Sequence, residues 1–184
     1  VTSKWTPMPS LNTSRLGCAA CVVDGRLIVV GGIGDEGILA SIEEYRPATQ
    51  TWTPLPDMLT ARCFLAAVEV RGKLVMIGGK DGSMESTDLV EEFDPRTGQG
   101  LYLPGMNEKR CGCVAVCVED EVFVLGGTDG HRHLNTVEQF DFRARRWLQK
   151  IPNMLSDRSY AAVGVVPMPG PRDQTARSSC HVAH

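Results

Sequence analysis

The chain has 184 residues, of which 42% are hydrophobic and 22% are charged, a composition typical of a folded protein of about one domain. A formal net charge of −3 gives no electrostatic basis for binding nucleic acid or an anionic membrane surface. No apolar run approaches the roughly 20 residues that a membrane-spanning helix needs, so we predict neither a nucleic-acid nor a membrane partner.

In chain order, the first recurring feature is an apolar run that ends in two glycines. It reads RLIVVGGIGD at 26–35, KLVMIGGKDG at 73–82 and EVFVLGGTDG at 121–130. The glycine pairs are Gly31 and Gly32, Gly78 and Gly79, and Gly126 and Gly127. A period of 47 or 48 residues is typical of a stacked supersecondary unit used several times.

Other positions keep the same period. An arginine stands six residues after a proline in each unit, at Arg15, Arg62, Arg110 and Arg158. Aromatic residues follow an acidic stretch at Tyr45, Phe93 and Phe140. Seven residues further on stand Trp52, Gly100 and Trp147, and Trp5 has the same position relative to an earlier unit. Gly100 departs from the pattern, and we expect Leu101 or Tyr102 to supply the missing bulk.

Each unit predicts four short strands and no helix. Runs rich in Val, Ile, Leu and aromatic residues alternate with Gly, Pro, Asp and Asn, which favours strands joined by turns. The complete units are 15–57, 62–106 and 110–154, called modules 1 to 3 below. One further strand is expected around Trp5 and another at 158–166, while 167–184 is expected to be disordered.

The combined marks resemble the kelch repeat, with its double glycine, its downstream aromatic and tryptophan and its period near 50. The resemblance covers about 5–166 and implies an all-β fold, a kelch-type β-propeller in which each module is one four-stranded blade. We expect a Cβ at the double glycines to obstruct close blade packing or to require a disfavoured backbone angle.

Three blades with one strand at each end make only part of a ring, because propellers have about four to eight blades. Three explanations stay open. The chain is the C-terminal part of a longer protein, or it pairs with a second copy, or it is a truncated product with no stable fold of its own. Closing the ring would remove its exposed sheet edges.

The cysteines and histidines do not form a recognisable site. Cys18 and Cys21 have a CxxC spacing, but strand residues three apart point to opposite faces, so we expect small buried thiols rather than a zinc or redox pair. His131 and His133 lie in a loop, and His181 and His184 in the tail. We predict no metal and no cofactor, and a reducing compartment, the cytoplasm or the nucleus.

The arginines are the candidate binding residues. Each precedes the innermost strand of a blade, so the four copies are expected to surround one mouth of the channel. There they would attract an acidic or extended peptide by bidentate capture of carboxylates. The adjacent loops add Ser14, Asn107, Glu108, Ser156 and Asp157. In the alternative interpretation, Glu43, Glu91 and Glu138 hold the arginines in place and their role is structural.

The resemblance to the kelch-like adaptors, in which arginines at this position contribute to a substrate pocket, implies a protein-binding module. It further implies substrate recognition for a cullin-RING ubiquitin ligase, with the cullin bound through BTB and helical domains outside this sequence. A cytoskeletal, actin-binding scaffold is the second binding hypothesis. A kelch-fold oxidase or sugar isomerase is the enzyme alternative, which the few tyrosines and histidines disfavour; we predict a protein that is not an enzyme.

Overall fold

The computed structural model describes residues 4–148 and 151–166, and the predicted disorder of 167–184, with His181 and His184, falls outside them. Module 1 forms one antiparallel sheet of four strands in the order β1-β2-β5-β6. The strands are β1 (Ala19–Val23), β2 (Arg26–Val30), β5 (Ile42–Arg46) and β6 (Thr51–Leu55). A two-stranded ribbon, β3 (Ile33–Gly34) with β4 (Gly37–Ile38), lies between β2 and β5.

Modules 2 and 3 repeat this meander. Module 2 contains β7 (Ala66–Val70), β8 (Lys73–Ile77), β9 (Val90–Asp94) and β10 (Gln99–Leu103). Module 3 contains β11 (Val114–Val118), β12 (Glu121–Leu125), β13 (Val137–Asp141) and β14 (Arg146–Leu148). The all-β fold and the four-stranded blades are therefore confirmed, and the described residues contain no helix, so none that could cross a membrane.

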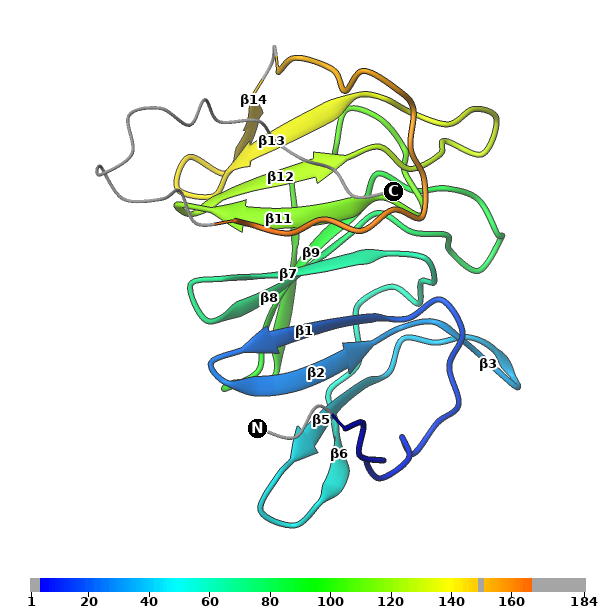
Figure 1. Cartoon of the computed structure of the whole chain (residues 1–184), viewed down its shortest axis with the longest axis vertical. Coiled ribbons are helices and arrows are strands. Elements are labelled where there is room, and N and C mark those ends of the chain that lie inside the picture. Colours follow the sequence, from blue (N-terminus) through cyan, green and yellow to red (C-terminus); the bar gives the residue numbers. More distant parts are fainter. Residues whose placement is uncertain (1–3, 149–150, 167–184) are drawn as a thin grey trace.

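The three blades fan out around a common hub. The first strands β1, β7 and β11 lie next to one another in that order, with the later strands of each module further out (Figure 1). One apolar core, which includes Ile28, Leu74 and Phe93, joins blades 1 and 2. A second, which includes Val75, Val124 and Phe140, joins blades 2 and 3. The ring is partial, and among the described residues only blade 2 packs against a neighbouring blade on both faces.

The double glycines let neighbouring blades approach at backbone distance. An ideal Cβ on Gly31 would lie 2.4 Å from the carbonyl oxygen of Arg62, and one on Gly78 would lie 2.3 Å from that of Arg110. Both glycines have a positive φ, 64° and 61°. The expectation that a Cβ here obstructs blade packing and also requires a disfavoured angle is confirmed.

The two predicted end strands are absent. Residues around Trp5 carry no strand, and the Trp5 side chain is fully exposed. Residues 158–166, the orange end of the trace in Figure 1, carry none either. A strand exists only when a neighbouring strand pairs with its backbone groups, and no strand pairs with either segment within the described residues. These two expectations were wrong for that reason.

Candidate partner-binding rim

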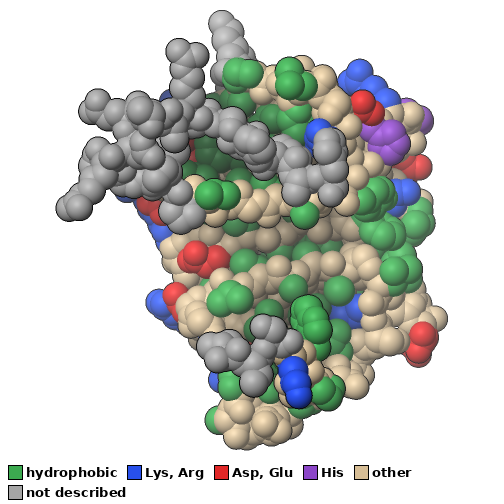
Figure 2. All heavy atoms as spheres, in the orientation of Figure 1, with side chains coloured by type: hydrophobic (Ala, Val, Ile, Leu, Met, Phe, Trp, Pro, Cys, Tyr) green, Lys and Arg blue, Asp and Glu red, His purple; other side chains and the backbone are tan. Residues whose placement is uncertain are grey.

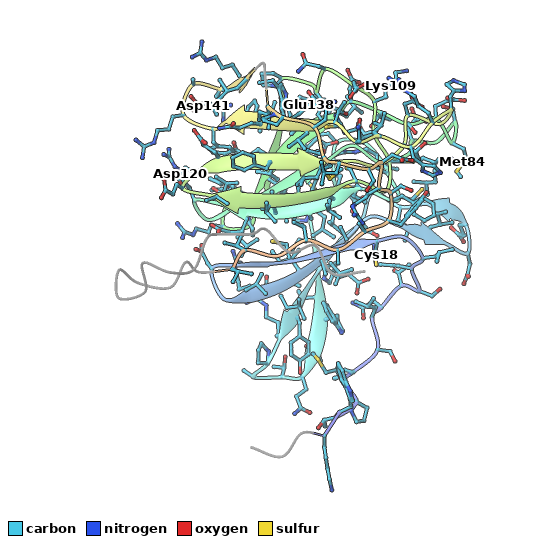
Figure 3. The ribbon with its side chains drawn as sticks, turned by 45° about the horizontal axis from the view of Figure 1, so that its top comes forward. Cys18, Met84, Lys109, Asp120, Glu138 and Asp141 are labelled. Carbon is cyan, nitrogen blue, oxygen red and sulfur yellow. The ribbon has the colours of Figure 1, made fainter. Side chains whose placement is uncertain are left out.

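The long connections of all three modules gather on one side of the molecule, and the tight hairpin turns gather on the other. The connections 33–41, 80–89 and 128–136 lie on the right in Figure 1. In Figure 3, Met84 and Lys109 lie on this side, whereas Asp120 and Asp141 lie on the opposite, turn side. We call the first side the loop side.

Arg62 lies inside blade 2, with no exposed surface. Its Nη1 donates to the carbonyl oxygen of Gly78 at 2.7 Å and to that of Leu89 at 3.1 Å. Its Nη2 donates to Glu91 Oε1 at 2.9 Å. Burial lowers the pKa of this guanidinium, and the charge of Glu91 opposes that effect. The side chain thus connects the double glycine to the third strand of its own module.

Arg110 and Arg15 repeat this arrangement. Arg110 Nη1 donates to Gly126 O at 2.7 Å, and its Nε donates to Glu138 Oε1 at 3.1 Å. Arg15 Nη1 donates to Gly31 O at 2.9 Å, and its Nη2 lies 2.7 Å from Glu43 Oε1. Both guanidinium side chains are fully buried. Each of the three modules therefore contains its own internal arginine–glutamate pair in the same arrangement.

The glutamates also hold the linker that precedes each arginine. Glu138 accepts from the backbone N–H of Asn107 at 2.7 Å and of Glu108 at 3.2 Å, and Glu91 accepts from that of Leu59 at 2.9 Å. Glu43 accepts from those of Asn12 and Thr13. Burial alone would raise the pKa of Glu43, but the hydrogen bonds from Arg15 and from this backbone outweigh it and hold the pKa below its usual value.

The expectation that these arginines bind a partner is therefore corrected for Arg15, Arg62 and Arg110. Their guanidinium groups are buried and paired, so the structural alternative describes them. Arg158 is different. Its residue is partly exposed, and its side chain makes no hydrogen bond or ion pair to the residues that the structure describes. For Arg158 a binding role stays a prediction.

The loop residues predicted beside the arginines divide into two groups. Asn107 and Glu108 belong to the internal network: Asn107 Nδ2 donates to Glu138 Oε2, and Glu108 Oε2 lies 2.8 Å from Arg110 Nη2. Ser14, Ser156 and Asp157 are exposed on the linkers. The first two therefore position the linker of module 3, while the exposed three are free to meet a partner.

The hub mouth on the loop side is built from residues two positions after each arginine. The Phe64 N–H donates to Gly17 O at 2.7 Å, the Gly112 N–H to Phe64 O at 2.8 Å, and the Tyr160 N–H to Gly112 O at 2.7 Å. All four residues have a positive φ between 54° and 64°, which is rare for aromatic residues. One continuous chain of backbone bonds thus fixes the mouth across all three blades.

The two aromatic rings cover the two glycines of this chain. A Cβ on Gly17 would lie 2.6 Å from the Phe64 ring, and one on Gly112 would lie 2.7 Å from the Tyr160 ring. The rings meet edge to face, with centroids 5.7 Å apart. Aromatic and glycine residues alternate around the mouth, so each ring is supported by the flat backbone of its neighbour.

Apolar side chains remain exposed here on a rigid backbone. Leu16 is 66% exposed, Tyr160 60% and Met84 46%, although a β-bridge fixes Leu16 against Ile33. Figure 2 shows hydrophobic side chains along this edge of the molecule. We call Leu16, Phe64 and Tyr160 the rim patch. The three loop-side connections carry six acidic and two basic side chains: Asp35, Glu36, Asp81, Glu85, Asp88, Asp129, Lys80 and Arg132.

The expectation of small buried thiols is confirmed for Cys63, Cys111 and Cys113, whereas Cys18 is exposed, so for Cys18 it was wrong. Burial raises the pKa of Cys113 to about 12 and that of Cys21 to about 11, which disfavours the reactive thiolate. All six cysteines in the described ranges are free. No three His, Cys, Asp or Glu side chains within these ranges gather in a way that could hold a metal ion. His133 Nδ1 instead lies 2.8 Å from Ser159 Oγ and connects its loop to the linker.

Sequence reasoning missed the aromatic residues of the hub mouth, Phe64 and Tyr160. Their signal was the position two after each arginine, which reads Gly17, Phe64, Gly112 and Tyr160. An alternation with a period of two modules is invisible to a search for residues that recur in every module. The tryptophans of modules 1 and 3 each hold the linker that precedes their module. Trp52 Nε1 donates to Pro9 O at 3.0 Å, and Trp147 Nε1 donates to Pro104 O at 2.8 Å.

The chain is similar to known proteins in fold and in sequence. The chain superposes on the solved structure of YjhT with a TM-score of 0.74 at 20% identity, over 84% of this chain and 57% of that one. It is also similar to spermatocyte protein spe-26 of Caenorhabditis elegans, with 46% identity over 46 residues, which are 25% of this chain and 8% of that protein. The chain thus spans less than two thirds of either relative. The family model of the KLHDC2/KLHL20/DRC7 Kelch-repeats domain matches residues 1–166, and the chain belongs to this Kelch-repeat family.

Proposed function

We propose that the chain is a protein-binding module and that a segment of its partner docks on the rim patch. Kelch membership supports protein binding in general, and the rim patch supports this location. Exposed apolar and aromatic residues on a fixed backbone bind with little loss of conformational entropy. The observation that carries the proposal is the exposure of Leu16 and Tyr160 beside a fully bonded hub mouth.

The rim patch fits a partner segment that carries an apolar or aromatic anchor residue. An acidic segment was expected only because four arginines were placed at the mouth, and three of them are neutralised internally by glutamates. The surrounding loops carry more acidic than basic side chains, which disfavours an acidic flank. An extended segment with an apolar anchor and neutral or basic flanks fits the surface better.

In the cell, we assign this binding to substrate recognition for a cullin-RING ubiquitin ligase, with cullin contact made by domains outside this sequence. Kelch membership supports a receptor role, and the raised thiol pKa values support a module that performs no thiol chemistry. Six free cysteines in the part of the chain that the structure describes support a reducing location, the cytoplasm or the nucleus. An actin-binding scaffold is the second candidate.

A matched pair of variants tests the rim patch. Leu16→Asp places a charge in the patch, and Val22→Asp places the same charge at an exposed apolar residue near the turn side. Both side chains are more than half exposed, so both variants should fold, which thermal melting checks. Partners that wild type captures should be lost from Leu16→Asp and kept by Val22→Asp. Equal binding by both variants would contradict the location.

A second experiment separates the ligase from the scaffold. An excess of the isolated module should compete with complete adaptors for substrate, so the half-life of the captured partner should lengthen, whereas Leu16→Asp should leave it unchanged. Cosedimentation with actin filaments and an unchanged partner half-life would instead establish the cytoskeletal candidate.

A further inference from the structure

The outermost strand of blade 2 leaves a row of backbone groups unpaired. β6, β10 and β14 are each the last strand of their sheet, and β6 and β14 lie at the outer ends of their blades in Figure 1. Val70 and Lys73 close a two-residue hairpin, so they form a hydrogen-bonded pair. Such pairs alternate along an antiparallel ladder. Followed through β8 and β9, this alternation leaves Gly100 and Tyr102 of β10 with their N–H and C=O groups facing outwards.

The outer strands of the other two blades are protected. By the same alternation, Trp52 and Pro54 face outwards in β6. The Trp52 carbonyl accepts from Asn12 Nδ2 at 3.0 Å, and Pro54 has no N–H to offer, which is a common protection of edge strands. Within the described range β14 has three residues, of which Trp147 alone faces outwards. Neither strand therefore presents two complete residues to a further strand.

β10 has none of these protections. Its sequence, QGLYL, contains no proline and no charge. Leu59 stands where module 1 has Asn12, so this position offers no donor to the Gly100 carbonyl. Three apolar side chains beside this edge are exposed, Leu59 by 49%, Leu101 by 41% and Tyr102 by 52%. An uncharged edge strand with exposed apolar side chains is a template for a further strand.

We propose that β10 pairs with β10 of a second copy of the chain, antiparallel and about a two-fold axis that passes between the two Leu101 residues. Gly100 then lies opposite Tyr102 of the second copy and exchanges both N–H···O bonds with it, and the symmetry repeats this pair. A register centred on Gly100 or on Tyr102 would instead place the other outward residue opposite Gly98 or Pro104, outside the strand. The register centred on Leu101 uses both outward residues of both copies.

The side chains also fit each other in this register. Opposite residues of neighbouring strands point to the same face, so the Tyr102 ring would cover Gly100 of the second copy. A Cβ on Gly100 would have Leu59 as its nearest neighbour at 3.6 Å, so the ring has room and an apolar contact there. An aromatic ring over a glycine stabilises a strand pair. The sequence Gly-Leu-Tyr is thus complementary to itself, which favours a second copy over an unrelated strand.

This contact at the outer edge of blade 2 leaves the hub mouth, the rim patch and residues 158–166 uncovered, so the inference is independent of the proposed function. It also fixes how the two copies face. β10 follows a turn-side hairpin and runs towards the loop side, and its counterpart runs the opposite way. The two loop sides therefore point in opposite directions, so each copy would take its own partner segment.

Sedimentation equilibrium of the full chain over a series of concentrations tests the dimer, and hydrogen exchange locates it. The outward amides of Gly100 and Tyr102 should become protected as the concentration rises. The amide of Leu101, which pairs with Glu92 inside the blade, is already bonded in the monomer and serves as the internal reference.

Two substitutions at one position separate strand pairing from general adhesion. Tyr102→Pro removes an outward N–H and should weaken dimerisation at least about tenfold. It should fold, because Pro54 has the same position in β6 of blade 1, and thermal melting checks this. Tyr102→Phe keeps the ring and the N–H and should dimerise within about threefold of wild type.

A cross-link tests the register. Opposite Cα atoms in a pair of this kind lie about 4.5 Å apart, a distance that a disulfide spans. Oxidised glutathione should therefore join two copies of Leu101→Cys through the introduced thiols and be reduced to glutathione, and mass spectrometry of the digest identifies the bond. Gln99→Cys is the control, because its two copies would lie about 13 Å apart and should not be joined.

Three results would overturn the proposal. The first is a chain that stays monomeric at every concentration at which it is soluble. The second is equal dimerisation by Tyr102→Pro and wild type, which would move the contact to another surface, such as the open faces of blades 1 and 3. The third is a monomeric chain whose Tyr102→Pro variant loses a captured partner, which would assign the edge to a strand of another protein.

Discussion

The carbonyl oxygen of Arg110 occupies the space that a Cβ on Gly78 would need, 2.3 Å from its ideal position. The same oxygen accepts a hydrogen bond from the Gly79 N–H at 2.8 Å. The obstacle is backbone, so no rotation of a side chain can remove it. One carbonyl thus sets both the spacing of two blades and the residue type that ends the second strand.

Gly78→Ala should destabilise the chain by about 2–4 kcal/mol, which combines overpacking against backbone with a positive φ. Gly82→Ala is the matched control, because its Cβ would meet nothing within 4 Å and its φ is not positive. Urea unfolding of both variants gives the comparison. Similar midpoints would show that the blades separate easily enough to absorb a methyl group.

Arg62→Met should destabilise the fold by about 3–5 kcal/mol, because it leaves the buried Glu91 without its cation. Arg62→Met combined with Glu91→Leu should recover part of this loss, since no uncompensated charge remains. Chemical unfolding measures both variants. If Arg62→Met keeps the stability of wild type and loses only a partner, the arginine binds ligand after all.

Leu89→Thr should be more stable than Leu89→Val by about 1 kcal/mol, the net contribution of one hydrogen bond. Ser41 Oγ and Thr136 Oγ1 accept from the arginine Nη2 of their modules at 2.9 and 2.7 Å. Leu89, at the same position, offers no hydroxyl. Leu89→Val has the shape of threonine without the hydroxyl, so the difference between the two variants isolates the bond. Equal melting temperatures of Leu89→Thr and Leu89→Val would show that the added hydroxyl forms no such hydrogen bond.

Gly100→Trp should install the contact that module 2 lacks. Here Tyr102 OH bonds Thr60 Oγ1 at 2.7 Å, while the indoles of modules 1 and 3 reach the linker carbonyl. A Cβ on Gly100 would lie 3.6 Å from Leu59, which is an ordinary contact distance, so a side chain can be added here. Replacing a glycine inside a strand also stabilises the strand. We expect a gain of about 1 kcal/mol over Gly100→Phe, which cannot donate. Calorimetry compares the two.

The repeat could be predicted because one backbone constraint recurs in every module. Gly31, Gly78 and Gly126 each face a carbonyl of the next arginine, and only glycine fits there. The role of the arginines could not be predicted with the same certainty, because a guanidinium fork binds a partner's carboxylate and an internal glutamate equally well. Which one it meets depends on how the linker docks, and this is a tertiary property.

The end segments could not be predicted because strand formation is not local. Residues 158–166 have the apolar character of β7 and β11, but their state depends on whether a neighbour pairs with them. The aromatic residues at the hub mouth were missed for another reason. Phe64 and Tyr160 alternate with Gly17 and Gly112, so their role becomes visible only when the modules are placed side by side.

Glu43 should make stability depend on pH. Burial disfavours its charged form, but hydrogen bonds from Arg15, Asn12 and Thr13 prevail and lower its pKa below the ordinary 4.5. A lowered folded-state pKa contributes stability that is complete above the unfolded-state pKa and is lost as the pH falls through the folded-state value. Glu43→Gln should therefore be less stable than wild type near neutral pH, and the difference should shrink below about pH 4.5. Urea unfolding of both proteins across this range measures it, and a difference that stays constant into acid would show that the Glu43 carboxylate has no such role.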